Sequence, residues 1–244
     1  MKIKIGVLAG KGGVGKTTVS HLLALGFARA DFDTALLVTD PEREVELFPS
    51  DTRPYVVTDA RTQGKFAESI AFANEFEGNL AVIIDGAGNK TGYYKAIVEN
   101  TDLIVIPFTS GYVDMMKAKD DINELREAGA LRIRLIRSRW SPPELENDET
   151  VRLMNQTFGD DIKYLLDYSV TETSSKDKPL RRLTLPNLKF QHTATNLDED
   201  LVTGAESALK DIDSNKVGFI SGFITHSSDL LVKCLIESFE KPKQ

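Results

Sequence analysis

The chain has 244 residues, 41% of them hydrophobic and 27% charged, and its formal net charge is −7. This length and apolar content predict one α/β domain with an ample core, and the acidic balance differs from that of a generally basic nucleic-acid binder. No apolar run reaches 18 residues and a strand is predicted at once, so we expect neither a membrane span nor a secretory signal, and a cytoplasmic location. Cys234 is the sole cysteine, which excludes a disulfide framework within the chain.

Apolar runs and helical periodicities alternate along the chain from its beginning. The apolar runs predict strands at 3–9, 34–39, 54–58, 80–85, 102–107, 131–137 and 162–168. Helices are predicted at 15–30, 64–77, 92–100, 112–128, 148–158 and 197–212. Strands that alternate with helices indicate a doubly wound, mainly parallel sheet with helices on both faces, here in a single domain over 1–244. Such a sheet binds its ligand beyond the carboxyl ends of the strands.

A glycine-rich loop stands between the first predicted strand and the first predicted helix. It fits the pattern G-x-x-x-x-G-K-[ST] and ends on Lys16 and Thr17. Glycines let consecutive backbone N–H groups turn toward an anion, and the positive end of the helix dipole adds to the attraction. The pattern predicts a nucleotide phosphate site, with Lys16 at the β- and γ-phosphates, Thr17 on Mg²⁺ and Thr18 at the α-phosphate. The residues expected to bind nucleotide here are Gly10, Lys11, Gly12, Gly13, Val14, Gly15, Lys16, Thr17 and Thr18.

A second lysine, Lys11, lies inside the loop, where an ordinary phosphate loop needs none. The run from Lys11 to Thr18, KGGVGKTT, resembles the deviant Walker A box of the ParA/MinD family of P-loop ATPases, and of its partition-type members in particular. The resemblance implies ATP as the nucleotide and an ATP-dependent homodimer in which Lys11 reaches the nucleotide of the other subunit as a catalytic cation. Such a cation stabilises the transferring phosphoryl group only after two subunits have paired. The alternative is a solvated loop lysine.

Two carboxylates extend the resemblance. Asp40 and Pro41 match the switch I pattern D-x-D-P-Q, whereas Val38 and Glu42 stand where the family has Asp and Gln. The resemblance assigns Asp40 to the attacking water or the magnesium shell, and the missing first carboxylate predicts slow hydrolysis. Asp85 ends an apolar strand in the Walker B arrangement, which predicts a role in holding Mg²⁺.

Further segments match the family more loosely. The predicted helix at 112–128 corresponds to the segment at the family's dimer face, and the run 137–142 is similar to the MinD-type turn beside the base. By that likeness Arg139 is the candidate for stacking on adenine; the alternative is that Arg137 and Arg139 face water. Iron–sulfur branches of the family need paired or bridging cysteines, so one cysteine excludes cluster roles. The periodicity of residues 216–225 allows either a helix or a strand. After this segment we expect a helix that is capped by Ser228 and packs on the sheet.

The resemblance favours an ATP-dependent dimerisation switch of the DNA-partition type, which acts with a partner or activator protein. Non-specific DNA binding would need local basic patches, because the net charge is acidic. Alternatives are a MinD-like membrane-associated positioning ATPase, a conjugative-transfer accessory ATPase and a ligase or synthetase on the same fold. Membrane attachment is disfavoured because Glu237 and Glu240 offset the lysines of the last helix. The candidate patch residues are Arg126, Arg132, Arg134, Lys178, Arg181 and Arg182.

Overall fold

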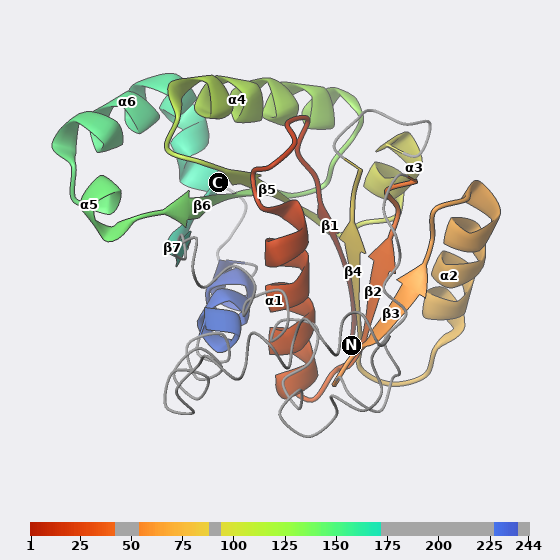
Figure 1. Cartoon of the computed structure of the whole chain (residues 1–244). Coiled ribbons are helices and arrows are strands. Elements are labelled where there is room, and N and C mark those ends of the chain that lie inside the picture. Colours follow the sequence, from red (N-terminus) through yellow and green to blue (C-terminus); the bar gives the residue numbers. More distant parts are fainter. Residues whose placement is uncertain (42–53, 88–93, 172–226, 239–244) are drawn as a thin grey trace, which may run out of the picture.

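Seven strands form one sheet among the residues that the computed structural model describes, which are 1–41, 54–87, 94–171 and 227–238 (Figure 1). They are β1 (Lys2–Val7), β2 (Asp33–Val38), β3 (Val56–Asp59), β4 (Leu80–Asp85), β5 (Leu103–Phe108), β6 (Ile133–Trp140) and β7 (Leu165–Thr171). Every neighbouring pair is parallel. The order β3-β2-β4-β1-β5-β6-β7 puts β1 between β4 and β5, where the direction of winding reverses. Ligands of open α/β sheets bind at such a switch point.

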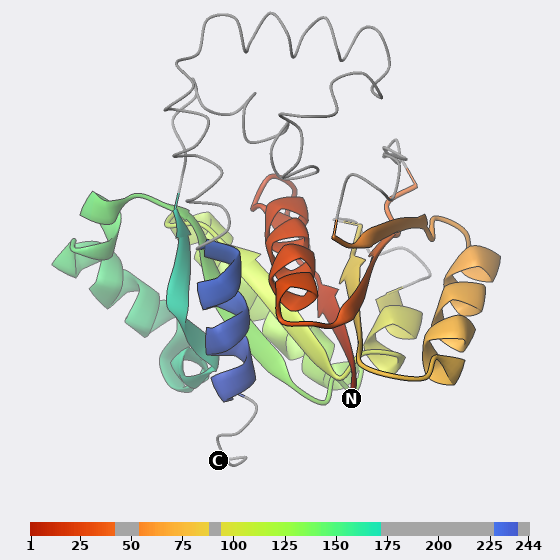
Figure 2. The same ribbon diagram turned by 90° about the horizontal axis from the view of Figure 1, so that it is seen from below.

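Helices cover both faces of this sheet, as Figures 1 and 2 show. They are α1 (Lys16–Arg29), α2 (Gln63–Glu75), α3 (Tyr94–Glu99), α4 (Tyr112–Glu127), α5 (Pro142–Leu145), α6 (Asp148–Phe158), the short 3₁₀ helix η2 (Gly159–Tyr164) and a helix at 227–238. Buried side chains of α2, α3, α4 and α6 pack on one face. Those of α1 and of the helix at 227–238 pack on the other. The predicted fold class is therefore confirmed.

The predicted elements match the observed ones closely wherever the structure describes them. β4 and α6 have the predicted bounds, and the other predicted strands and helices differ at their ends by a few residues. These elements were recognisable because each has its own local periodicity. The predicted helix at 197–212 and the segment 216–225 lie outside the described residues. The single domain over 1–244 stays a prediction.

The end of β6 differs from the prediction for this segment. The segment 137–142 is similar to a turn in sequence, but β6 continues to Trp140, which is fully buried and packs edge-to-face on Phe108 at 5.8 Å between ring centroids. The pairing of β6 with β7 shifts register twice in this part. Bulges of this kind re-aim side chains at a sheet edge. Here Ser138 and Arg139 come to lie against the glycine-rich loop.

The helix at 227–238 lies beside α1 (Figure 2). Leu231, Val232 and Leu235 are buried between α1 and the sheet, so the prediction that this helix packs on the sheet is confirmed. Gly26 of α1 allows the contact, because a Cβ there would lie 2.5 Å from the backbone oxygen of Ser228. Ser228 itself is buried within the helix, which already includes residue 227, so the predicted cap at Ser228 is wrong.

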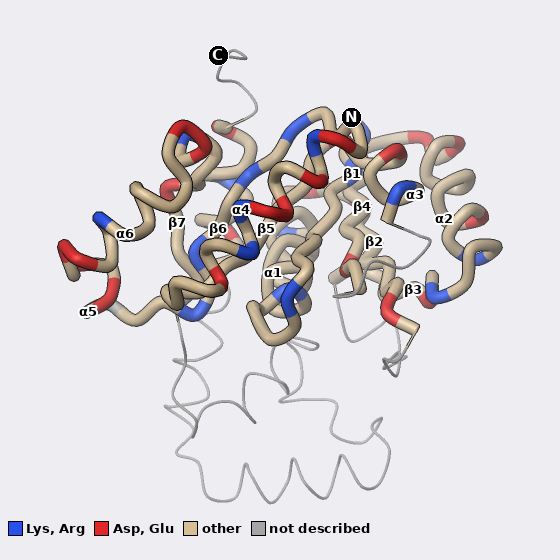
Figure 3. Tube along the Cα trace, turned by 90° about the horizontal axis from the view of Figure 1, so that it is seen from above, with Lys and Arg blue, Asp and Glu red and all other residues tan. Residues whose placement is uncertain are grey.

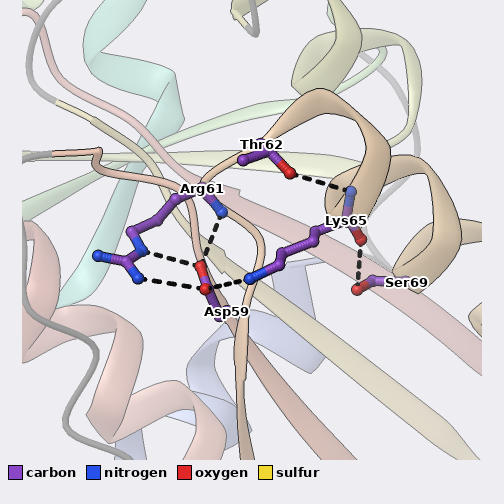
Figure 4. A network of polar contacts seen from close by, with 5 residues as sticks. All are labelled: Asp59, Arg61, Thr62, Lys65 and Ser69. Carbon is purple, nitrogen blue, oxygen red and sulfur yellow. Dashed lines mark hydrogen bonds and ion pairs between the residues drawn. The ribbon is translucent and has the colours of Figure 1, made fainter.

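At the carboxyl end of β3, one carboxylate joins this edge strand to α2 (Figure 4). Asp59 accepts hydrogen bonds from Nε of Arg61 at 2.8 Å and from Nζ of Lys65 at 2.7 Å. These two cations hold the pKa of Asp59 well below its usual range. Thr62 caps α2 by accepting a hydrogen bond from the backbone N–H of Lys65 at 3.3 Å.

Candidate nucleotide phosphate site

The glycine-rich loop joins β1 to α1 and has the backbone geometry that an anion site requires. Gly13 and Gly15 have φ angles of 79° and 92°, in the left-handed region that favours glycine. Gly15 is the N-cap of α1 and no side chain caps this helix, whose first amides have no intrahelical acceptor. A Cβ at Gly12 would meet no described atom within 4 Å, so the loop is open there to a ligand. Val14 is buried in the core and anchors the loop.

The two outer glycines of the loop are held closely between α4 and β6. A Cβ at Gly10 would lie 2.7 Å from Oδ1 of Asp121, and one at Gly15 would lie 2.4 Å from Oγ of Ser138. Gly10 also donates its backbone N–H to Oδ2 of Asp121 at 2.8 Å. Both neighbours are buried. The sequence analysis missed Asp121 and Ser138, since only the packing of α4 and β6 brings them to the loop.

The negative charges of three carboxylates act on Lys16. Its ammonium donates to the carbonyl oxygen of Lys11 at 2.9 Å. Burial lowers the pKa of Lys16, while the negative charges of Asp85, Asp40 and Asp121 act against that shift. The structure therefore brings the predicted residues Lys16, Asp40 and Asp85 into one charge cluster at the carboxyl edge of the sheet. Their individual roles stay predictions.

The two residues predicted to hold a metal ion lie in direct contact. Oγ1 of Thr17 donates to Oδ2 of Asp85 at 2.8 Å, and Asp85 is buried. Ser20, one helical turn after Thr17, donates its hydroxyl to Oδ1 of Asp85 at 3.2 Å. The contact of Ser20 with Asp85 was not predicted from the sequence. Hydroxyl and carboxylate oxygens are hard ligands, and Mg²⁺ usually takes one or two of them from a protein and completes its shell with phosphate and water oxygens. This donor set fits the predicted Mg²⁺.

Asp40 follows β2 and is half-buried. Val38, which stands where the resemblance places a first Asp, is buried in β2 in register with Asp85 of β4. An apolar side chain therefore occupies the position next to Asp85, the carboxylate of the neighbouring strand that is predicted to bind metal. Glu42, which stands at the end of the predicted switch I pattern, lies outside the described residues.

Lys11 is paired within its own subunit. Its ammonium forms an ion pair with Oδ1 of Asp114, in the first turn of α4, and Thr109 donates its hydroxyl to the other oxygen of that carboxylate. The side chain of Lys11 is 44% exposed and that of Asp114 is 14% exposed. Burial by itself raises the pKa of Asp114, but the hydrogen bonds from Lys11 and Thr109 outweigh it and the pKa is lowered. Lys11 is thus ion-paired rather than simply solvated.

Arg139 also contacts the loop. It has a φ of 63°, which is uncommon for a residue other than glycine, and its guanidinium donates to the carbonyl oxygen of Gly13 at 3.0 Å. The structure therefore places Arg139 on the phosphate loop, and its stacking on adenine stays a prediction. Arg137 is half-buried, and burial lowers its pKa, so the alternative that both arginines face water does not hold for Arg137.

The fold and this edge of the sheet define a class of protein. The parallel sheet carries a glycine-rich loop between β1 and α1, and a threonine that follows this loop contacts an aspartate at the end of a strand. These features define the nucleotide-binding core of a P-loop NTPase.

Comparisons with known proteins agree. The family model described as "ParA: NUBPL iron-transfer P-loop NTPase" matches residues 1–41. The putative septum site-determining protein MinD of Guillardia theta is 25% identical over 261 residues, which cover 87% of this chain and 92% of that protein. The MinC:MinD cell division complex of Aquifex aeolicus gives a TM-score of 0.59 at 14% identity, over 74% of this chain and 85% of that one. A putative plasmid partition protein from Borrelia burgdorferi B31, bound to AMPPNP, gives 0.55 at 16% identity, over 86% and 98%.

The resemblance seen in the sequence is therefore confirmed, since the chain is similar to P-loop NTPases of the ParA/MinD type. The likenesses to solved structures are below 25% identity and bear on the fold alone.

Proposed function

We propose that this protein is an ATP-binding dimerisation switch that hydrolyses ATP slowly and serves in DNA partition. The observation that carries the proposal is the separation of the two loop lysines. Lys16 lies in the charge cluster with Asp40 and Asp85, whereas Lys11 lies on the exposed side of the loop against α4. This separation supports a role for Lys16 at the phosphates of its own subunit and a role for Lys11 at the nucleotide of a second subunit.

In this proposal each residue at the carboxyl edge of the sheet has a role in binding or hydrolysing ATP. The loop amides and Lys16 bind the phosphates, Thr17 and Asp85 hold Mg²⁺, and Asp40 orients the water that attacks the γ-phosphorus, so that ADP and phosphate are released. A Mg²⁺ ion held by these residues would supply positive charge that offsets the negative charge of the phosphates. Because Val38 replaces a carboxylate, we expect turnover below the range of about 1–100 s⁻¹ that is usual for kinases.

The test is the mass of the protein in solution, measured by light scattering with ATP, with ADP and without nucleotide. We expect the parent to pair in ATP and the Lys11→Ala variant to remain monomeric. Lys95→Ala is a matched control, because Lys95 is 78% exposed on α3 and pairs with Glu99 on the same helix. If Lys11→Ala pairs as well as the control does, Lys11 does not act on the second subunit.

A DNA surface would have to be local. In Figure 3, basic and acidic segments are interspersed over the described elements. Two of the predicted patch residues serve contacts within the protein, since Arg126 pairs with Asp161 and Arg134 donates to the carbonyl oxygen of Ser238 at 2.6 Å. The partition role is therefore tested directly by a gel shift on plain duplex DNA across a salt series, with ATP, ADP and no nucleotide. Binding through cations must weaken steeply as salt rises.

The second candidate is a MinD-like positioning ATPase, which the similarity to the putative MinD protein of Guillardia theta favours. Within the described part of the chain, no helix combines the length and apolarity that crossing a bilayer requires. The apolar face of the helix at 227–238 packs in the core. Co-sedimentation of the whole protein with anionic liposomes, in ATP, in ADP and without nucleotide, separates this candidate from the first. Iron transfer, named in the family model's description, is not proposed, because Cys234 is the sole cysteine.

A further inference from the structure

Helix α4 holds the phosphate loop at two consecutive residues. Asp114, in its first turn, pairs with the side chain of Lys11, and Asp121, seven residues later, accepts the backbone N–H of Gly10 at 2.8 Å. Residues seven apart lie two turns along the same face of a helix. Both contacts join segments more than 100 residues apart in sequence, so they depend on the packing of α4 against the sheet.

The contact at Lys11 conflicts with the task proposed for that residue. An ammonium that is bound to Asp114 of its own subunit is not at the phosphates of another subunit. We propose that Asp114 is the positioning residue of Lys11, and that the transfer of Lys11 from Asp114 to the nucleotide of a second subunit sets the threshold for ATP-dependent pairing. This inference rests on the proposed function, since it takes the action of Lys11 on the second subunit as given.

The carboxylate of Asp114 keeps other stabilising contacts when Lys11 leaves it. Its second oxygen keeps the hydrogen bond from Thr109, and the positive charge of Arg139 acts on it as well. Asp114 also lies in the first turn of a helix of 16 residues, where the helix dipole stabilises a negative charge. Release of Lys11 therefore leaves the carboxylate of Asp114, which is 14% exposed, with a hydrogen bond and a nearby cation, and costs about as much as breaking a partly exposed ion pair. A triphosphate carries more negative charge than one carboxylate and can draw the lysine away.

The test is the dissociation constant of the homodimer in a non-hydrolysable ATP analogue, measured by sedimentation. Asp114→Asn removes the charge that holds Lys11 and keeps an oxygen that can accept from Thr109. We expect its dimer to be about tenfold tighter than that of the parent, because each of the two subunits no longer has an ion pair to break. Asp120→Asn is the matched control: it makes the same charge change on α4, but Asp120 is 57% exposed and lies 3.9 Å from Lys117.

A double-mutant cycle separates positioning from a structural role. In the Lys11→Ala background, Asp114→Asn should leave the dimer constant unchanged, because the residue through which it acts is absent. Asp114→Glu, which restores the carboxylate, should return the constant toward that of the parent. If Asp114→Asn does not fold, as judged by its thermal melt, Asp114→Ser removes the same charge and suits the first turn of a helix.

The outcomes distinguish the two proposals. A parent protein that does not pair in the ATP analogue refutes the proposed function. A parent that pairs, together with an Asp114→Asn variant that pairs like Asp120→Asn or more weakly, overturns the inference about Asp114 alone. A tighter dimer that persists in the Lys11→Ala background also overturns it, since the effect would not pass through Lys11.

Discussion

The contact between α1 and the helix at 227–238 predicts the effect of a single methyl group. Gly26→Ala would place a Cβ 2.5 Å from the backbone oxygen of Ser228 and 2.5 Å from Cγ2 of Val232. The valine can rotate, but the carbonyl belongs to the helix backbone, so the helix at 227–238 must move. Overpacking of this kind costs about 1–3 kcal/mol, and the better helix propensity of alanine returns about 1 kcal/mol. We expect a net loss of up to about 2 kcal/mol in the free energy of unfolding.

Gly64→Ala is the matched control for this prediction. Gly64 also lies in a helix, α2, but a Cβ there meets no described atom within 4 Å, so alanine should stabilise by up to about 1 kcal/mol. Thermal unfolding followed by circular dichroism is the assay, and for a chain of this size each kcal/mol shifts Tm by about 2–4 °C. Gly26→Ala should melt several degrees below Gly64→Ala. Equal melting temperatures would refute the packing of the last helix on α1, and its apolar face would then be free for another partner.

Two further predictions concern carboxylates. Asp85→Asn should lower the affinity for a fluorescent ATP analogue about tenfold or more when Mg²⁺ is present, because it removes a charged oxygen beside Thr17. In EDTA the same variant should change this affinity little. An equal loss of affinity in both buffers would rule out a role of Asp85 in metal binding. Burial raises the pKa of Asp161, but hydrogen bonds from Arg126 and Lys119 outweigh it, so the pKa is lowered overall. The stability that Asp161 contributes is thus present above its unfolded pKa of about 4 and is lost as pH falls through the lowered folded value. Asp161→Asn should therefore cost about 2 kcal/mol at pH 7 and progressively less below about pH 4, in urea unfolding at each pH. A cost that stays the same at low pH would show that the charge of Asp161 contributes nothing.

Local patterns were enough to predict the sheet, the helices and the phosphate loop. The strands and helices follow from periodicities within each segment, and the loop from the spacing of its glycines before Lys16 and Thr17. Asp85 was also recognisable, because a carboxylate at the end of an apolar strand accompanies this loop in the family that the sequence resembles. The end of β6 was missed because the bulges at its pairing with β7 depend on a neighbouring strand.

The amino-acid sequence by itself determined that this protein folds as a doubly wound P-loop NTPase and which residues form its glycine-rich loop, because these features depend on residues close together in the chain. Only the tertiary structure decided what holds that loop. Asp114, Asp121 and Ser138 come from α4 and β6, and no spacing in the sequence connects them with the glycines or with Lys11. The physical reason is that a carboxylate on a helix face binds whatever the packing of that helix brings within hydrogen-bonding distance, and this packing is set by the whole core.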